Sequence, residues 1–435
     1  MYRKTLIASA LALFLSPALY AADLLEVYQD AVKQDAELAV ERARLETSRA
    51  QSTQATSFLL PQVTASGTFT KTDIEDAPKK MDNTNFSVEA QQVLINGEAW
   101  YGRTAAKAAF NAAEAGYSDA EQNLLLRVAE AYFKVLRAED NLRSSQAEEQ
   151  AIKRQLDQAQ EQYDVGLISI TNVLEARAAY DGARAARIGT EAALMISYED
   201  LEQITGERYE SIDALNKELP IAAPVPNDRQ AWVDQALTSS LILQAARAGL
   251  TASEESLKSK RSGHLPTVGL FAKYSKDSDV NNPITKAEGY DQTIFGLKAS
   301  LEIYGGGRTS AAIREGSAML DEAKSNEELA KRQVLQQTRS LFTQVSTDVL
   351  VVQARKLAIK SAESALEATR TGYEVGTRNI VDVLNAERAL WGARRDYDAA
   401  RYDYVVNQLR LKRVAGSLAE KDLQELNQWL VTAAK

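Results

Sequence analysis

The sequence of 435 residues contains two copies of one unit. Tyr163–Gly166 (YDVG) recurs as Tyr373–Gly376 (YEVG), and Leu60-Pro61 recurs as Leu265-Pro266. The copies lie about 210 residues apart, far beyond the roughly 20 to 50 residues of a solenoid repeat. The duplication predicts two similar halves about a pseudo-symmetric axis. We place them at 22–206 and 229–416, with a linker at 207–228 and a C-terminal segment at 417–435.

The first 21 residues have the pattern of a secretory signal peptide. Arg3 and Lys4 precede an apolar run from Thr5 to Ser16, and small residues follow around Ala21. The alternative, an uncleaved membrane anchor, is disfavoured because a spanning helix needs about 20 apolar residues. We therefore expect residues 1–21 to direct export and to be removed.

Composition narrows the choice of partners. The chain has 51 basic and 60 acidic residues and a net charge of -9. Loss of the two basic residues of the signal segment makes the chain more acidic still, which argues against nucleic acid as a partner. There is no cysteine, so disulfides cannot contribute to stability.

Long proline-free stretches rich in helix-forming residues dominate each half. The longest run from Gly97 to Gly166 and from Gly307 to Gly376, and each predicts a helix of roughly 100 Å. Heptad-spaced apolar residues such as Leu335, Phe342 and Val349 indicate a coiled coil or a helical tube. We interpret these residues as packing positions.

Shorter helices complete each half. One is expected over Asp23–Ser57 and again over Asp228–Ser262, and another over Ser169–Thr205 and again over Asn379–Ala415. Their lengths, roughly 50 and 55 Å, together equal the long helix. Each half is therefore expected to place one continuous helix beside two half-length helices. The linker and the C-terminal segment, including Trp429, would lie at mid-height.

The period changes to two over about 61–96 and 265–304, which predicts one β-hairpin in each half. The apolar positions are Val63, Ala65, Phe69, Phe86, Val88, Ala90, Val268, Leu270, Ala272, Tyr274, Phe295, Leu297, Ala299, Leu301 and Ile303. Runs of about 11 residues are long enough to cross a bilayer when tilted. Polar loops are expected at 72–84 and 276–290. Four such strands cannot close a barrel alone. Either the hairpins pack in a soluble domain, or several protomers share one barrel; the polar second face favours a shared barrel around a water-filled lumen.

Several short strings, in this order and duplicated, resemble the TolC family of outer-membrane efflux and secretion channels. They are Gly372–Leu384 (GYEVGTRNIVDVL), Val165–Thr171 (VGLISIT), Gly263–Pro266 (GHLP) and Tyr304–Gly307 (YGGG). Each string alone is weakly specific, but together they span nearly the whole chain after the signal segment.

The resemblance implies a mainly α fold with a small transmembrane β part. A homotrimer would form a 12-strand β-barrel in the outer membrane of a Gram-negative cell, among its lipids. The barrel would be continuous with a 12-helix α-barrel tunnel in the periplasm. The implied partners are a periplasmic adaptor (membrane fusion) protein and an inner-membrane transporter of the RND, ABC or MFS type. Drugs, toxic small molecules or polypeptides would leave through the duct, which performs no chemistry itself.

The same resemblance implies a periplasmic gate. Asp382 matches an aspartate that forms a three-fold carboxylate ring, which would attract cations. One turn further on, Asn385 replaces a second aspartate of the family pattern, so block by divalent cations should be weaker. The alternative for Asp382 is helix capping, with Asn379 as N-cap. Both roles can coexist.

A closed-state latch is also implied, between Gln155 and Arg378 and between Asn172 and Tyr373. Asn172 stands where the family has an aspartate, and neutral hydrogen bonds are weaker than charged ones, so this latch should be looser. Arg378 has an alternative as a solvated surface arginine. Gly166 and Gly376 would form the hairpin tips on which an adaptor docks. Turn formation alone also explains these glycines.

Enzymatic motifs are missing from the sequence. It has no nucleotide-binding loop, nucleophile elbow or metal-spaced His/Cys cluster, and its single histidine, His264, is expected to be structural. We therefore predict no enzyme activity, metal or cofactor. The alternative function is a soluble periplasmic coiled-coil structural or adaptor protein, although the chain lacks the Gly-rich β-domain segments expected around an adaptor's single hairpin.

Overall fold

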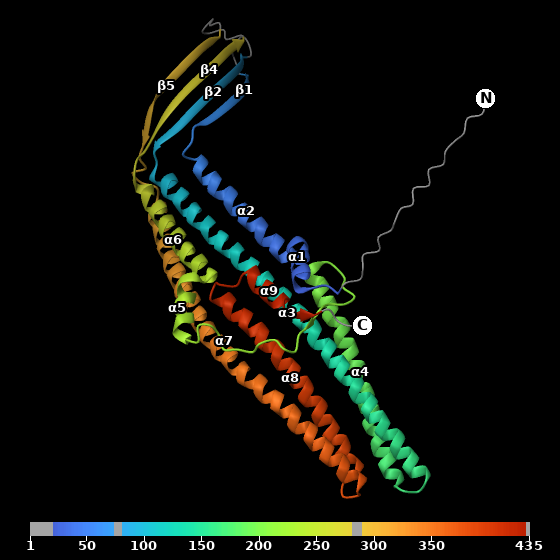
Figure 1. The fold of residues 1–435 in the computed structure, drawn as a ribbon. Coiled ribbons are helices and arrows are strands. Elements are labelled where there is room, and N and C mark those ends of the chain that lie inside the picture. Colours follow the sequence, from blue (N-terminus) through green and yellow to red (C-terminus); the bar gives the residue numbers. More distant parts are fainter. Residues whose placement is uncertain (1–20, 74–80, 281–288, 432–435) are drawn as a thin grey trace, which may run out of the picture.

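The computed structural model describes residues 21–73, 81–280 and 289–431. The predicted signal peptide, apart from Ala21, lies outside these residues, as do parts of both predicted hairpin loops. The molecule is long, with a four-stranded sheet at one end and two helical hairpins at the other (Figure 1). Within the described residues, no helix has both the length and the apolar character needed to cross a membrane.

Two very long helices form the framework, as the sequence predicted. Helix α3 spans Gly97–Asp164 (68 residues) and α7 spans Arg308–Glu374 (67 residues). Helix α3 begins where the Asn96 side chain accepts a hydrogen bond from the Ala99 N–H, and α7 begins after Gly307 in a left-handed conformation. Each pairs in a hairpin with a shorter helix, α4 (Ile170–Thr205) or α8 (Ile380–Val414).

The helices predicted over 23–57 and 228–262 are each broken in two, which corrects that prediction. The first is α1 (Leu24–Gln34) and α2 (Ala36–Ser57), and the second is α5 (Arg229–Ser239) and α6 (Leu241–Arg261). The breaks fall at Asp35 (ψ 117°) and Ser240 (ψ 122°), equivalent positions of the two halves. An extended residue cannot continue the helical hydrogen bonding, so it ends one helix and begins the next.

All four long strands form one antiparallel sheet in the order β1-β2-β4-β5. The strands are β1 (Gln62–Thr72), β2 (Met81–Ile95), β4 (Thr267–Val280) and β5 (Tyr290–Ser300). They continue into the segments predicted as loops, 72–84 and 276–290, because cross-strand pairing extends the ladder through polar residues. Strand β5 ends at Ser300, so Leu301 and Ile303, which were predicted to belong to the strand, lie beyond it.

The register gives the sheet one apolar and one polar face. Val63 pairs with Ala90, Ala90 with Ala272, and Ala272 with Phe295. On the other face, Thr64 pairs with Glu89 and Glu89 with Lys273. Because side chains alternate between faces along a strand, the predicted two-residue pattern is confirmed across all four strands. The apolar face is open in the single chain, where Phe295 is 82% exposed.

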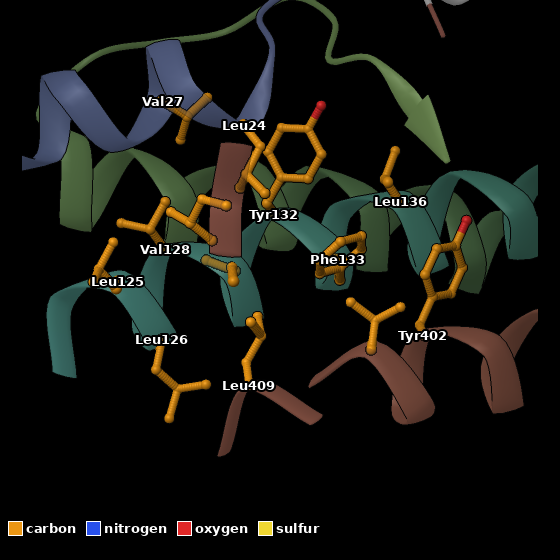
Figure 2. Close-up of a cluster of buried hydrophobic side chains, with 14 of the residues drawn as sticks. Leu24, Val27, Leu125, Leu126, Val128, Tyr132, Phe133, Leu136, Tyr402 and Leu409 are labelled. Atoms are coloured by element: carbon orange, nitrogen blue, oxygen red, sulfur yellow. The ribbon is translucent and has the colours of Figure 1, made fainter. Parts of the chain in front are cut away.

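The main hydrophobic core lies at mid-height, where α1, α3 and α8 meet (Figure 2). Tyr132 and Phe133 of α3 are fully buried and pack edge to face, with ring centroids 5.9 Å apart. The Tyr132 hydroxyl donates to the Asp213 carbonyl oxygen (2.8 Å), which ties the segment after α4 to the core. Burying such large aromatic side chains stabilises the fold by about 2 kcal/mol each.

The segment after α4 and the C-terminal segment meet against this core. Strand β3 (Ala214–Leu215) pairs with β6 (Leu430–Val431), which follows the short helix α9 (Glu420–Asn427). The Asn216 N–H donates to the carbonyl oxygen of Trp429 (2.8 Å), and Trp429 packs on the core. The mid-height packing expected for Trp429 is therefore observed.

Candidate functional site

The two helical hairpin tips are built in the same way. In the first tip the Gly166 N–H donates to Tyr163 O (2.8 Å), and in the second the Gly376 N–H donates to Tyr373 O (3.0 Å). Both glycines have positive φ, +78° and +80°, a conformation that a side chain disfavours. The duplicated YDVG and YEVG strings thus encode duplicated turns. Val165 and Val375, which precede the glycines, are 71% and 69% exposed.

Asp382 lies in the first turn of α8, and its contacts are those of a capping box. Its N–H donates to Asn379 Oδ1 (2.9 Å), and its carboxylate accepts from the Asn379 N–H (3.2 Å). The carboxylate also lies where a helix dipole favours negative charge. Asp382 is half-buried and Asn385, one turn further on, is exposed. The capping alternative is therefore confirmed in the single chain, and the side chain retains an exposed surface for a second role.

The latch residues are arranged differently from the prediction. The Tyr373 hydroxyl donates to Gln162 Oε1 of α3 (3.0 Å), not to Asn172. Gln162 lies in the last turn of α3 and Asn172 in the first turn of α4. Burial raises the pKa of Tyr373, which keeps the hydroxyl protonated as a donor.

The other predicted latch pair, Gln155 and Arg378, stays a prediction for the closed state. In the described part of the chain, neither Gln155 nor Arg378 has a side-chain hydrogen bond to the other. Arg378 is exposed and its aliphatic part lies over Gly372, where an added Cβ would come within 2.8 Å of Arg378 Cγ. In the single chain, Arg378 is thus a surface arginine packed on its own tip.

Helices α3 and α8 are joined by polar contacts that the sequence reading missed. The Tyr402 hydroxyl donates to Asp140 (2.6 Å), and Arg395 pairs with Glu148 (2.7 Å). The remaining pairs are Arg413–Asp119, Arg410–Glu130 and Arg137–Asp403. The complementary charges along α3 and α8 are visible in the sequence. The sequence alone does not show that these two helices are neighbours.

Another missed feature is an ion pair within the second hairpin whose carboxylate is buried. Glu387 of α8 is 1% exposed and pairs with Arg370 of α7. Burial of a carboxylate is unfavourable unless it is paired. The pair therefore fixes the register of α7 against α8 two residues beyond Asn385.

Asp398 is a third missed group, beside the contact between α8 and β3. Burial, followed by the charge of Asp140, raises its pKa from 3.8 to about 6. Arg401, which is 2% exposed, lies 3.8 Å from the Asp398 carboxylate and donates to the Asn216 carbonyl oxygen.

Asp398 is expected to make the protein more stable as the pH falls from 7 to 5. Its pKa is higher in the folded chain, so between pH 4 and 6 the folded state binds more protons than the unfolded state. Asp398→Asn should raise stability at pH 7 by about 2 kcal/mol and remove this pH dependence. Thermal unfolding from pH 5 to 7 tests this, with exposed Asp157→Asn as control. An unchanged pH profile in Asp398→Asn would contradict the prediction.

Comparison with known proteins identifies the family. The outer membrane efflux protein family matches residues 27–207 and 232–417, once in each half. The chain belongs to the outer membrane efflux protein family. It is 33% identical over 423 residues to the outer membrane protein TolC of Vibrio cholerae, covering 97% of both chains. It is 35% identical to TolC of Escherichia coli K12, covering 94% of this chain and 85% of that one.

Secretion proteins and solved channels of this type are also similar. The alkaline protease secretion protein AprF of Pseudomonas aeruginosa is 27% identical, with 97% of this chain and 90% of AprF covered. Among solved structures, the outer membrane protein VceC of V. cholerae has a TM-score of 0.80 at 19% identity, with 90% of this chain and 96% of VceC covered. The similarity to VceC shows that the two proteins share a fold. Membership of the outer membrane efflux protein family makes this chain an outer-membrane exit duct of the efflux or type I secretion kind.

Proposed function

We propose that three copies of this chain form the working duct. Each protomer contributes four strands to a 12-strand barrel in the outer membrane and four helices to a 12-helix periplasmic tunnel. The observation that carries this proposal is the sheet, whose strands β1 and β5 are edges and whose apolar face is open. An unpaired strand edge is unstable in lipid, because its polar backbone groups have no hydrogen-bond partners there. Pairing between the edge strands of neighbouring protomers would supply these partners for both edges.

The helical part supports the same assembly. Helix α4 exposes Ile188, Met195 and Ile196 (52%, 61% and 60%), and α7 exposes Leu350 and Leu357 (66% and 67%). Stripes of exposed apolar residues at helical spacing are buried when helices pack against one another. They suit contacts between protomers in a closed ring of helices.

The partners are an adaptor protein and an inner-membrane transporter of the RND, ABC or MFS type. Support comes from relatives that are named as efflux proteins or as secretion proteins, such as the efflux protein BepC of Brucella suis and the secretion protein AprF. The exposed tips at Gly166 and Gly376 are the docking points for the adaptor. The cargo is drugs, toxic small molecules or polypeptides.

The gate lies at the start of α8. In a trimer, Asp382 would be repeated three times about the axis, with Asn385 one turn away, and three carboxylates would favour cations over anions. Latching in the closed state is assigned to Tyr373 through Gln162, while Gln155, Arg378 and Asn172 are available for contacts between protomers.

Single-channel recording of the detergent-purified protein in a planar bilayer tests the proposal. Small, long-lived, cation-selective steps from protein whose mass in detergent is that of a trimer are expected. Folded, monomeric protein that stays soluble without detergent and gives no steps would instead favour a periplasmic coiled-coil structural or adaptor protein.

A further inference from the structure

A hollow of about 470 Å³ lies on the polar face of the sheet, near the end where the strands meet the helices. Its lining comes from β2, β4 and β5 and includes Glu89, Gln91, Gly269, Phe271 and Lys298. These side chains share one face because Gln91 pairs with Phe271, Glu89 with Lys273, and Gly269 with Lys298. The hollow is thus separate from the helical tips and the gate residues.

Two glycines allow close packing in and beside the hollow. At Gly269 an added Cβ would lie 3.2 Å from the backbone oxygen of Gln92, beside the irregularity in β2 between Val93 and Ile95. At Gly296 an added Cβ would lie 3.2 Å from Cε1 of the Phe271 ring. The ring therefore lies against a strand position without a side chain. It forms an aromatic platform on this face, which also carries the apolar side chains of Val93 and Ile294.

Opposite charges flank this platform. Glu89 lies on β2 and Lys298 on β5, separated by β4. Along β4 their partner positions are four residues apart, which is roughly 14 Å. Glu89 accepts a hydrogen bond from Gln91, and in the described part of the chain neither Glu89 nor Lys298 forms an ion pair within the protein. Lys273 lies across from Glu89 on β4, and Glu89 forms no ion pair with it in the described residues, so both charges can still contact a ligand.

We propose that this hollow binds planar aromatic zwitterions of elongated shape. The ring system of such a molecule stacks on Phe271, its cationic end faces Glu89, and its anionic end faces Lys298. Offset stacking on an aromatic ring adds to simple burial of apolar area, and the two charges set the orientation of the ligand. The inference rests on the proposed function in one respect, because the trimer places this face inside the duct, where the site would contact cargo.

Binding of a fluorescent trans-stilbene that carries a trimethylammonium group at one end and a sulfonate at the other tests the site, because it is planar and its two charges lie at opposite ends. The full-length protein in a non-fluorescent detergent is titrated into the dye, and fluorescence anisotropy is measured. Phe271→Ala is expected to weaken binding about tenfold. Glu89→Gln and Lys298→Met should each weaken it roughly threefold, and added salt should reduce binding to the wild type.

The matched control is Phe295→Ala. Phe295 lies on the neighbouring strand but on the apolar face, where it is 82% exposed, so its removal should leave dye binding unchanged. Equal binding by the wild type and Phe271→Ala would overturn the site, as would equal weakening by Phe295→Ala. Conductance recorded on the same samples separates the two claims. If the samples form channels but dye binding does not depend on Phe271, only the site is disproved. If dye binding depends on Phe271 but no channels form, only the duct is disproved.

Discussion

Asp382→Asn is expected to lower the cation selectivity of the channel by roughly tenfold and to weaken block by divalent cations. An asparagine oxygen can still accept the hydrogen bond from the Asn379 N–H, so the capping box is largely retained while the charge is lost. At an effective dielectric constant of about 20, one charge 6 Å away contributes roughly 3 kcal/mol. Three carboxylates around one axis would therefore dominate ion entry at the gate.

Asn385→Asp is the complementary change. It adds a carboxylate one turn from Asp382 and should strengthen divalent block relative to the wild type. Reversal potentials in a salt gradient and titration with Mg²⁺ measure both effects, with exposed Asp181→Asn on α4 as the control. If Asp382→Asn forms trimeric channels of unchanged selectivity, Asp382 acts only as a helix cap.

Asp35→Ala should destabilise the protein by about 3 kcal/mol. Asp35 is 6% exposed, accepts the capping hydrogen bond from Leu38 N (2.7 Å), and binds both terminal nitrogens of Arg127 (2.8 and 3.1 Å). Loss of an N-cap costs about 1 kcal/mol. Loss of the two contacts with Arg127 adds more, because this partly buried arginine then keeps only Glu37 (3.2 Å) as a carboxylate partner.

The duplicated fold supplies the control for this change. Ser240 occupies the equivalent position, between α5 and α6, but its side chain makes no capping hydrogen bond. Ser240→Ala should therefore change stability by less than about 1 kcal/mol. Thermal unfolding of both variants in detergent measures the difference. Equal losses would show that the break itself, and not the contacts of Asp35, determines stability.

Much of the architecture follows from periodicity. The positions of β1 and β5, the lengths of α3 and α7, and the tip glycines could all be predicted, because each depends on residues close in sequence. The break at Asp35 was missed because strong helix formers lie on both sides, and an isolated aspartate is compatible with either a cap or a helix surface.

Contacts between helices were harder to predict. The sequence places Tyr373, Asn172 and Gln162 near the tips, but the rotation of each helix decides which oxygen the tyrosine hydroxyl reaches. The raised pKa of Asp398 likewise depends on burial and then on Asp140, which is more than 250 residues away in the chain. Such information resides in three-dimensional packing and not in local pattern.

The contacts between α3 and α8 also limit how the tunnel can change shape. The ion pairs follow the antiparallel packing of the two helices. From Arg413–Asp119 to Arg395–Glu148, the residue numbers fall along α8 and rise along α3. Each pair alone contributes little. Sliding α8 by one turn, about 5.4 Å, would nevertheless separate all of them together. The seam therefore resists translation of α8 along α3.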